Sequence, residues 1–467
     1  AYLDMGDIIR IARKTGADAI HPGYGFLSEN PDFAQLCADS GITFIGPSPE
    51  IMRRLGNKVE ARALAIEADV PVMPATEPLP HDAAEITRLA NEVGYPLMLK
   101  ASWGGGGRGM RVIEDESVLL EQVAAARREA QAAFGNDEVY LEKLVRNARH
   151  VEVQIMGDAH GQVVHLFERD CTVQRRHQKI VERAPAPYLS QAERDEISSA
   201  AVRLAQSVKY CNAGTVEFLQ DVDTGAFYFI EVNPRIQVEH TVTEQITGLD
   251  LVKSQIRIAA GARIGDVDSS GIPAQEDIQM RGAAIQCRVT TEDPRNNVIP
   301  DYGHIVAYRS PAGPGIRLDA VTAYSGAVIG RHYDSLLVKI TASGVSEAEA
   351  TDRMLRGLSE FRVRGVETNL AFLSALILNS RFIKGDYNTR FVDESPELLE
   401  LPPDRSHGAQ LLHFIGDVIV NGNSQVAGRK MPRVLKQPTA PRIVPQPPAN
   451  GVRQILDSDG PEAVAEY

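Results

Sequence analysis

The chain has 467 residues with 49 basic and 62 acidic side chains, and its formal net charge of −13 argues against a general binder of nucleic acids or of anionic membrane surfaces. No apolar run reaches the ~18–20 residues that a membrane-spanning helix needs. The four cysteines, Cys37, Cys171, Cys211 and Cys287, include no Cys-x-x-Cys pair, which argues against a disulfide framework and a zinc site, so any metal would be bound through oxygen.

The first part of the chain alternates helical and strand-like segments. Helices are predicted at 3–14, 31–39 and 58–68, and short strands at 19–21 and 43–45. This alternation predicts an open parallel sheet. The sequence His-Pro-Gly-Tyr-Gly-Phe follows the first strand, where α/β sheets usually carry ligands, although a glycine-proline turn without a ligand explains it equally well.

A glycine-rich loop at 101–109 lies between predicted strands at 95–100 and 110–113. Three of its glycines satisfy Gly-x-Gly-x-x-Gly, but a dinucleotide-binding loop must open a helix, and here a strand follows. No Lys-Ser/Thr pair follows either, as a P-loop would require. The loop is therefore interpreted as a flap whose backbone amides can close over phosphates. The alternative is a loop without a ligand, which would leave four consecutive glycines with a large entropic cost and no function.

A strand predicted at 139–143 leads to an antiparallel hairpin at 150–156 and 163–167. The run Arg-Asp-Cys-Thr-Val-Gln-Arg-Arg-His-Gln-Lys follows at 169–179. A charge run is usually a solvated surface. In an acidic chain, between β segments and before a proline-rich turn, it instead indicates a fixed loop that faces an anion.

Residues 214–240 contain the densest group of candidate ligands. Two predicted strands form a hairpin around an Asp-Thr-Gly turn and carry Glu217 and Glu231. Carboxylate oxygens suit a hard cation such as Mg²⁺, and a guanidinium suits a carboxylate-like anion. Ordinary surface charge is the alternative for the two glutamates. Further polar side chains follow the hairpin within eight residues: Asn233, Arg235, Gln237, Glu239 and His240.

The remainder predicts a second α+β unit and then a linker. Residues 281–344 predict antiparallel strands, and helices are predicted at 346–358 and 368–378. From Leu401 the composition changes and ends in a proline-rich stretch at 436–451, which is typical of a linker.

Six segments together resemble the biotin carboxylase domain of biotin-dependent carboxylases, an ATP-grasp fold. The first two are His-Pro-Gly-Tyr-Gly-Phe-Leu-Ser-Glu-Asn and the glycine flap with its flanks. The others contain the candidate residues of the hairpins and the sequence Gly-Pro-Gly-Ile-Arg-Leu-Asp. In chain order the segments are 21–30, 100–111, 142–154, 168–187, 229–252 and 313–319.

The resemblance implies an α/β and α+β chain with the ATP-grasp fold. It implies an N-terminal open parallel sheet domain at 1–80, incomplete because family members have a further β-α-β unit before Ala1. It also implies a glycine-flap lid subdomain at 81–160, the catalytic half of the ATP-grasp at 161–280, an antiparallel β-rich C-terminal subdomain at 281–400, and a linker or allosteric region at 401–467 that leads to a carboxyltransferase.

By this resemblance, ATP with Mg²⁺ or Mn²⁺, bicarbonate and biotin on a carrier domain react to give ADP, phosphate and carboxybiotin. The positions that match metal ligands are Glu217, Glu231 and Asn233. The positions that match ATP-binding residues are Lys58, Lys100, Gly104, Gly105, Gly106, Gly107, Glu142, Lys143, His150, Gln174, His177 and Leu219.

The resemblance assigns the remaining site residues to bicarbonate and biotin. The bicarbonate positions are Lys179, Arg235, Gln237 and the backbone of Val238, and those matching catalytic residues are Lys179, Arg235, Glu239 and Arg317. Glu239 matches the general base that takes the bicarbonate proton. Arg317 matches the residue that stabilises the charge developing on biotin, and Tyr24 borders biotin.

Segments 361–373 and 417–429 are most similar to pyruvate carboxylases. That likeness implies conversion of pyruvate to oxaloacetate overall, a biotin carboxyl carrier domain and a carboxyltransferase domain as partners, and a homo-oligomer in the bacterial cytoplasm or the mitochondrial matrix. No nucleic-acid or membrane partner is expected. Four residues resemble a region that binds acetyl-CoA as an activator: Asp404, Arg405, Arg429 and Lys430.

Three alternatives stay open. The chain could belong to an acyl-CoA carboxylase, to another ATP-grasp ligase that joins an acyl phosphate to an amine, or to a nucleotide-binding module without turnover. ATP hydrolysis that requires both bicarbonate and biotin distinguishes the carboxylase from the last two.

Overall fold

The computed structural model describes residues 2–103, 110–296, 298–320, 323–400, 411–412 and 414–416. The chain divides into two compact units, Ala1–Leu401 and Pro402–Tyr467. In the second unit the described residues are helical, and all elements named below belong to the first. The glycine flap at 104–109 lies outside the described residues, as do Asp404, Arg405, Arg429 and Lys430. Among the described helices, none has the length and apolar character to cross a membrane.

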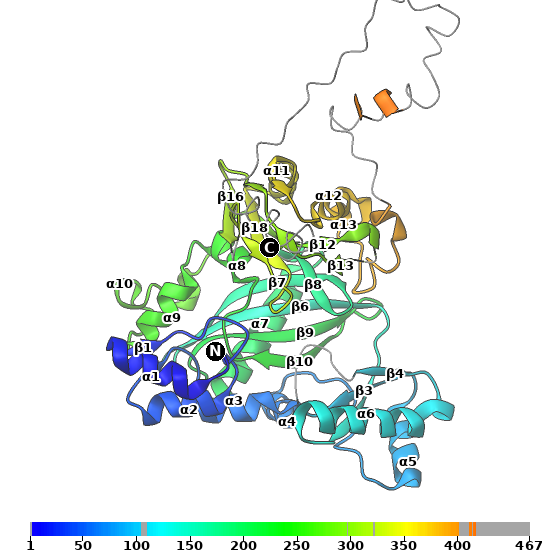
Figure 1. Cartoon of the computed structure of the whole chain (residues 1–467). Helices are drawn as coiled ribbons and strands as arrows, with labels where there is room; N and C mark the ends of the chain where they lie inside the picture. Colours follow the sequence, from blue (N-terminus) through cyan, green and yellow to red (C-terminus); the bar gives the residue numbers. More distant parts are fainter. Residues whose placement is uncertain are drawn as a thin grey trace, which may run out of the picture. The chain divides into compact units, whose positions relative to one another are not determined.

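An eight-stranded antiparallel sheet forms the centre of the first unit (Figure 1). Its order joins two hairpins to a C-terminal group of strands, so residues more than 100 positions apart become neighbours. In sheet order the strands are β10 (Phe227–Asn233), β9 (Asn212–Asp221), β6 (Ala148–Gly157), β7 (Val163–Arg175), β8 (Gln178–Ala184), β11 (Ala283–Thr290), β18 (Leu336–Gly344) and β16 (Ile316–Ala320).

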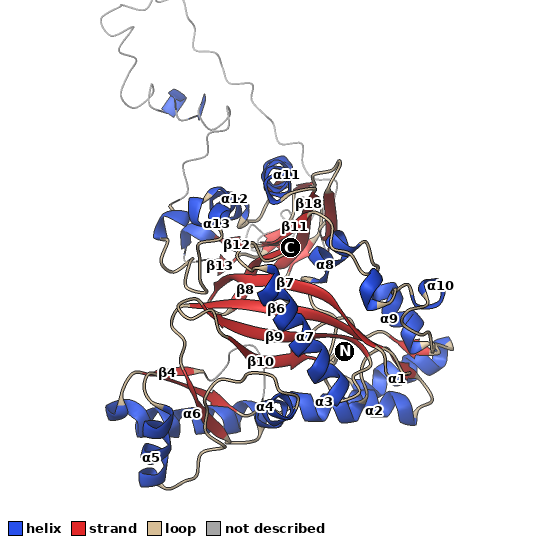
Figure 2. Cartoon of the chain, turned by 180° about the vertical axis from the view of Figure 1, so that it is seen from behind, coloured by secondary structure: helices blue, strands red, loops and turns tan. Residues whose placement is uncertain are grey.

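Two helices pack on this sheet. Helix α7 (Gln191–Ser207) begins at a capping box of Ser190 and Glu193 and lies across β6 and β7 (Figure 2). Helix α8 (His240–Thr247) contacts β7, β8, β11 and β18. Because only the short segment 234–239 joins β10 to α8, the polar residues after the hairpin are held over the middle of the sheet.

The N-terminal elements confirm the predicted alternation. Helices α1 (Met5–Thr15), α2 (Pro31–Asp39), α3 (Pro49–Gly56) and α4 (Lys58–Glu67) flank β1 (Ala19–Ile20) and β2 (Thr43–Phe44). The two strands pair in parallel, as expected for the open sheet. The side chain of Asn30 accepts a hydrogen bond from the Phe33 amide and caps α2.

A small antiparallel sheet in the order β4-β3-β5 has its own apolar core, which includes Leu97, Leu99 and Leu141. Strands β3 (Leu97–Ala101) and β4 (Arg111–Ile113) flank the glycine flap and pair with each other, which confirms that the flap joins two strands. The other elements of this part are α5 (Ala83–Val93), η1 (Glu116–Val118), α6 (Leu119–Phe134) and β5 (Val139–Lys143).

The C-terminal part packs helices on β11 and β18, as predicted from its α+β pattern. Its helices are α11 (Glu347–Glu360), α12 (Leu370–Leu378), α13 (Ser380–Lys384) and η4 (Pro396–Leu398). Short strands pair as β12 (Glu292–Asp293) with β13 (Ile299–Pro300), β14 (Gly303–His304) with β17 (Val328–Ile329), and β15 (Ala307–Arg309) with β19 (Arg362–Arg364). The remaining elements are α9 (Leu251–Ala259), α10 (Val267–Ser270), η2 (Gln275–Asp277) and η3 (Pro294–Asn296).

The charged run at 169–179 is not the loop that the sequence predicted. Strand β7 continues to Arg175 and β8 starts at Gln178, so the run forms two paired strands around a two-residue turn. Both turn residues, Arg176 and His177, have positive φ angles of 51° and 63°, as a tight hairpin turn requires. Arg169 at the start of the run is fully buried. The prediction was wrong because the clustered charges were interpreted as a loop that faces an anion, whereas they alternate along two paired strands and Arg169 is neutralised within the protein.

Candidate active site

Two of the three predicted metal ligands face each other across the β9–β10 hairpin. Glu217 on β9 is the register partner of Glu231 on β10, and Asn233 donates its side-chain N–H to Glu217 Oε1 at 2.9 Å. Lys58, the first residue of α4, lies 3.5 Å from Glu231 Oε2. The hairpin therefore brings the predicted set together, with two carboxylates and an amide oxygen at one end of the sheet.

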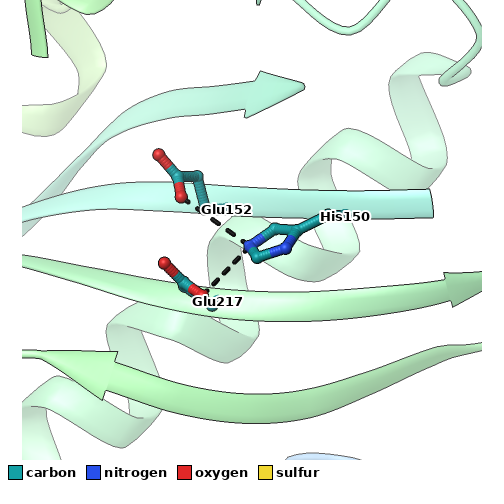
Figure 3. Close-up of side chains that lie close together, drawn as sticks. All are labelled: His150, Glu152 and Glu217. Atoms are coloured by element: carbon teal, nitrogen blue, oxygen red, sulfur yellow. Dashed lines mark ion pairs between the residues drawn. The ribbon is translucent and has the colours of Figure 1, made fainter. Parts of the chain in front are cut away.

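His150 and Glu152 on β6 extend this group from the neighbouring strand. Figure 3 shows one ring nitrogen of His150 directed at two carboxylates, with Nε2 3.0 Å from Glu217 Oε2 and 3.9 Å from Glu152 Oε2. Glu152 is fully buried and was not predicted. Strand alternation gave a signal for it, because residues two apart on a strand share a face and His150 was already a candidate.

Glu152 is buried together with Arg169 on β7. Arg169 Nε lies 2.6 Å from Glu152 Oε1, and its other nitrogens donate to side chains of β6, β9 and the chain beyond β10. These acceptors are Gln154, Thr215, Gln237 and Thr243. The N–H groups of Arg169 thus donate to acceptors within the protein and hold several chain segments at fixed distances. Arg169 is not an exposed anion binder.

Lys179 on β8 is the centre of the charged group. Its Nζ contacts Glu152 Oε2 at 2.5 Å, Glu217 Oε1 at 3.0 Å and Glu239 Oε1 at 2.8 Å. Burial favours the neutral amine, but the three carboxylates outweigh it and hold the pKa of Lys179 above its ordinary value. One ammonium thus links the metal-ligand candidate Glu217 to the proton-acceptor candidate Glu239.

Glu239 is the last residue before α8 and is nearly fully buried, at 2% exposure. Its second oxygen, Oε2, lies 3.1 Å from Arg288 on β11. Burial alone would favour the protonated acid, but Lys179, Arg288 and Arg169 together hold the pKa of Glu239 well below its ordinary value. Arg288 was not predicted from the sequence, because its closeness to Glu239 depends on the order of strands in the sheet.

The segment between β10 and α8 supplies the other bicarbonate candidates. Gln237 donates to Glu217 Oε1 at 2.9 Å. Arg235 makes an ion pair with Glu29 at 2.9 Å and donates to the Asn233 side chain at 3.1 Å. Arg235 therefore lies next to the metal-ligand group but is paired with a carboxylate from the N-terminal part of the chain.

The predicted nucleotide residues fall into separate groups. Lys100 on β3 and Glu142 on β5 form an ion pair, and Lys143 donates to the backbone carbonyls of Gly94 and Tyr95, at 2.8 Å each. Gln174 contacts His150 Nδ1 at 3.0 Å, while Leu219 is the register partner of His150. His177 is exposed in the hairpin turn, and Gly104, Gly105, Gly106 and Gly107 lie outside the described residues.

The biotin candidates lie at the other end of the sheet. Arg317 on β16 contacts Glu244 Oε2 at 2.5 Å and makes a two-pronged ion pair with Asp319, at 2.9 and 3.0 Å. The position of Glu244 on α8 connects Arg317 to the helix that Glu239 precedes. Tyr24, after β1, is half-buried, and burial followed by the Asp319 charge raises the pKa of its hydroxyl.

Three family models match the chain in succession. Residues 1–52 match the N-terminal domain of biotin carboxylase, residues 57–267 the ATP-binding domain of the carbamoyl-phosphate synthase L chain, and residues 286–394 the C-terminal domain of biotin carboxylase. The biotin carboxylase domain of 2-oxoglutarate carboxylase from Hydrogenobacter thermophilus, solved with MgADP, ADP and bicarbonate, is 42% identical with a TM-score of 0.82. The match covers 86% of this chain and 87% of that one.

The chain belongs to the biotin carboxylase family. Membership confirms the expected ATP-grasp fold class. Among the family, pyruvate carboxylases are similar over the full chain. A pyruvate carboxylase from Rhizobium etli, solved with the allosteric activator acetyl coenzyme A, is 57% identical with a TM-score of 0.84, and human mitochondrial pyruvate carboxylase is 50% identical over 465 residues. This biotin carboxylase chain spans 41% of the first protein's chain and 39% of the second.

Proposed function

We propose that the chain carries out the ATP- and bicarbonate-dependent carboxylation of biotin, as the first half-reaction of a pyruvate carboxylase that converts pyruvate to oxaloacetate overall. The observation that carries this proposal is the bridge from Glu217 through Lys179 to Glu239, with contacts of 3.0 and 2.8 Å. This bridge holds a hard-cation ligand and a proton acceptor within reach of one ammonium. Such an arrangement is suited to an enzyme that joins a phosphate of a nucleotide to a small anion.

The metal group fits Mg²⁺ by its donor chemistry. Glu217, Glu231 and Asn233 offer oxygen atoms, which Mg²⁺ prefers, and Lys58 lies beside Glu231 where it can reach a phosphate. When bound, the ion supplies charge neutralisation for the phosphates of ATP. The same proposal assigns Lys100, Glu142, Lys143, His150, Gln174, His177, Leu219 and the glycine flap to the nucleotide.

Bicarbonate is assigned to Lys179, Arg235, Gln237 and the backbone of Val238, with Glu239 as the acceptor of its proton. With its ion pairs in place the pKa of Glu239 is low, so the carboxylate is ionised but a weak base. When a bound anion takes over contacts from Lys179, the stabilisation of the Glu239 anion falls and its basicity rises. The ion pairs described above thus become the means of activating the base.

Biotin is assigned to the region of Arg317 and Tyr24. The negative charge that develops on the ureido oxygen during transfer needs a fixed cation, and Arg317 is oriented by Glu244 and Asp319. Both carboxylates contact guanidinium nitrogens and so fix the direction of the side chain. A cation whose orientation is fixed in advance is what a charge that exists only along the reaction path requires.

The relatives support a proposal about the wider assembly, which belongs to the same proposed function. One relative is described as a complete multifunctional pyruvate carboxylase and another as a biotin carboxylase domain dimer. We assign to this chain a biotin carboxyl carrier domain, a carboxyltransferase domain and a second copy as partners, with acetyl-CoA as an activator. Similar proteins are mitochondrial in humans and also occur in Bacillus subtilis, so a mitochondrial matrix or a bacterial cytoplasm fits the family.

The deciding experiment measures ADP release by the protein with and without bicarbonate and free biotin. The proposal expects hydrolysis that depends on both. Hydrolysis that does not respond to bicarbonate would favour another ATP-grasp ligase, and nucleotide binding without hydrolysis would favour a binding module. Addition of an acyl-CoA in place of pyruvate to the full-length protein tests the acceptor separately.

A further inference from the structure

Lys339 is a buried lysine in the middle strand of the C-terminal part of the sheet. It lies on β18, where its register partners are Arg288 on β11 and Asp319 on β16. Direct register partners project to the same face of a sheet. Lys339 therefore lies in one row with the arginine that contacts Glu239 and the aspartate that orients Arg317. Its exposure is 2%, so its charge is withdrawn from solvent.

The ammonium of Lys339 is directed at the polypeptide backbone. Its Nζ donates to the carbonyl of Val238 at 2.9 Å, the residue next to Glu239. Within the described residues, no carboxylate forms an ion pair with it, whereas Lys179, Arg288 and Arg317 all have such a partner. Nζ also lies 5.6 Å from the centre of the Tyr24 ring. A buried ammonium without a carboxylate is costly, and its burial holds the pKa of Lys339 below the ordinary value.

This contact holds the backbone of a short turn, whose side chains Gln237 and Glu239 are held by other partners. Glu239 has no side-chain capping bond at the start of α8, because its carboxylate is used by Lys179 and Arg288. The turn is closed by His240, which contacts the Gln237 carbonyl through its backbone N–H at 3.3 Å and through Nδ1 at 2.7 Å. The bond from Lys339 adds a charged anchor from the sheet to the backbone of this turn.

We propose that Lys339 is a positioning residue for biotin carboxylation, which holds the Val238–Glu239 peptide so that the bicarbonate segment and Glu239 keep their places beside Lys179. The inference rests on the proposed function, because it concerns the site assigned to bicarbonate. Lys339 acts through the peptide that it holds, and its nearness to Tyr24 places the anchored turn between the bicarbonate and biotin candidates.

The test compares the wild-type protein with Lys339→Met, which keeps the side-chain volume but removes the donor, and Lys339→Arg, which keeps donor and charge. Arg356→Met is the matched control, since Arg356 also donates to a backbone carbonyl, that of Ala312 at 2.9 Å, outside residues 235–240. Two quantities are measured: amide hydrogen exchange of residues 235–240 without substrates, and the KM values for bicarbonate and MgATP.

The Met variant is expected to raise exchange in 235–240 about tenfold and the KM for bicarbonate about tenfold, with the KM for MgATP within about twofold of wild type. The Arg variant should recover most of both effects, and Arg356→Met should show neither. Unchanged exchange in 235–240, or a uniform rise across the whole chain including α9, would overturn the proposal. Lys339→Gln, which keeps a neutral donor, provides the comparison if the Met variant does not fold.

The two measurements, hydrogen exchange and enzyme kinetics, test this inference and the proposed function separately. If the wild-type protein shows no hydrolysis that depends on bicarbonate and biotin, the proposed function fails, and with it any role of Lys339 in that reaction. The exchange comparison would still decide whether Lys339 holds the turn. If wild-type activity is present and exchange is unaffected by Lys339→Met, the proposed function stands and the role of Lys339 is refuted.

Discussion

At the scale of single residues, Glu239 lies between two cations, and this pairing sets what its substitution should do. Replacing Glu239 by Gln keeps the shape but removes the charge that Lys179 and Arg288 share. We expect biotin carboxylation to fall by roughly 10²–10⁴-fold, the range of a lost general base, while MgATP affinity changes little. Steady-state kinetics and nucleotide titration measure the two quantities.

A surface carboxylate provides the control for that substitution. Glu394→Gln removes a charge that pairs with Arg390 at 2.6 Å far along the chain from the site, and should leave both quantities unchanged. A collapse of nucleotide affinity in Glu239→Gln would contradict the role assigned to Glu239, because it would place that carboxylate on the nucleotide.

His240 makes a prediction about acid stability. Burial, followed by the Lys339 charge, lowers its pKa from 6.5 to about 4, although the hydrogen bond to the Gln237 carbonyl and the Asp319 charge act in the opposite direction. Between about pH 4 and pH 6.5 the unfolded chain therefore binds a proton at His240 that the folded chain does not bind. The contribution of His240 to stability is full above pH 6.5 and is lost as the pH falls toward 4. Because of His240, the free energy of unfolding should fall by about 2 kcal/mol between about pH 7 and about pH 5.

Urea unfolding of wild type and His240→Gln at about pH 7 and about pH 5 measures this contribution, and the variant should lose less stability on acidification than wild type by about that amount. The window lies above the range in which Glu217 and Glu239 take up protons, since their pKa values lie below the ordinary value of 4.5. An equal pH dependence of the two proteins would show that His240 is not held neutral.

At the scale of elements, Arg169 ties β6, β7, β9 and the segment before α8 into one unit. Arg169→Met would leave Glu152 buried with one cation fewer, so we expect a loss of about 3–5 kcal/mol in the free energy of unfolding. The double variant Arg169→Met with Glu152→Gln should lose less than the sum of the single losses, because the uncompensated charge is gone. Chemical denaturation measures all three.

The exposed ion pair of Arg88 with Glu92 on α5 is the matching control, and Arg88→Gln should change stability little. Additive losses in the Arg169 and Glu152 variants would mean that the two side chains are stabilised independently. The comparison therefore distinguishes a coupled pair of buried charges from contacts that stabilise the fold independently.

The sequence predicted the elements that carry the metal candidates but not the way they are joined. The β9–β10 hairpin was predictable because period-two alternation and a turn place Glu217 and Glu231 on paired strands. The closeness of Arg288 to Glu239 was not predictable, because about 100 residues separate β8 from β11 and no local pattern indicates that these strands pair. Arg169 was wrongly placed in a loop that faces an anion, because its partners are acceptors from other segments of the chain that no local pattern indicates.

The assigned roles of the site residues go beyond what residue pattern alone could supply. Glu142 and Lys100 look like an ordinary cross-strand ion pair, and nothing in their spacing indicates a nucleotide. Their assignment came from the family resemblance. The roles themselves remain predictions, while family membership is established by the match to biotin carboxylase.

At the scale of the whole molecule, the metal group connects parts of the chain that are distant in sequence. Lys58 of α4 meets Glu231 of β10, and Val72 bridges to Phe229 on the same strand. A ligand bound at Glu217 and Glu231 should therefore stabilise the unit Ala1–Leu401 cooperatively. At roughly a hundred times its dissociation constant, MgADP would add about 2.7 kcal/mol.

Thermal unfolding with ADP and Mg²⁺ tests this expectation. The midpoint should rise with MgADP, fall back when a chelator removes the metal, and rise little in Glu231→Gln. Glu196→Gln on α7 serves as the control that keeps the full shift, because that helix carries none of the residues assigned to the metal or the nucleotide. A shift in Glu231→Gln equal to that of wild type would remove Glu231 from the metal group.

The bridge formed by Lys179 also bears on how the chain treats ATP in the absence of its second substrate. With Glu239 occupied by Lys179 and Arg288, a water molecule near the nucleotide meets a proton acceptor that is already neutralised. Under the proposed function, idle hydrolysis is then suppressed until bicarbonate displaces these contacts. The ion pairs of the site would thus act as a safeguard against futile turnover, and the selectivity for bicarbonate over water would originate in the protein's own carboxylates.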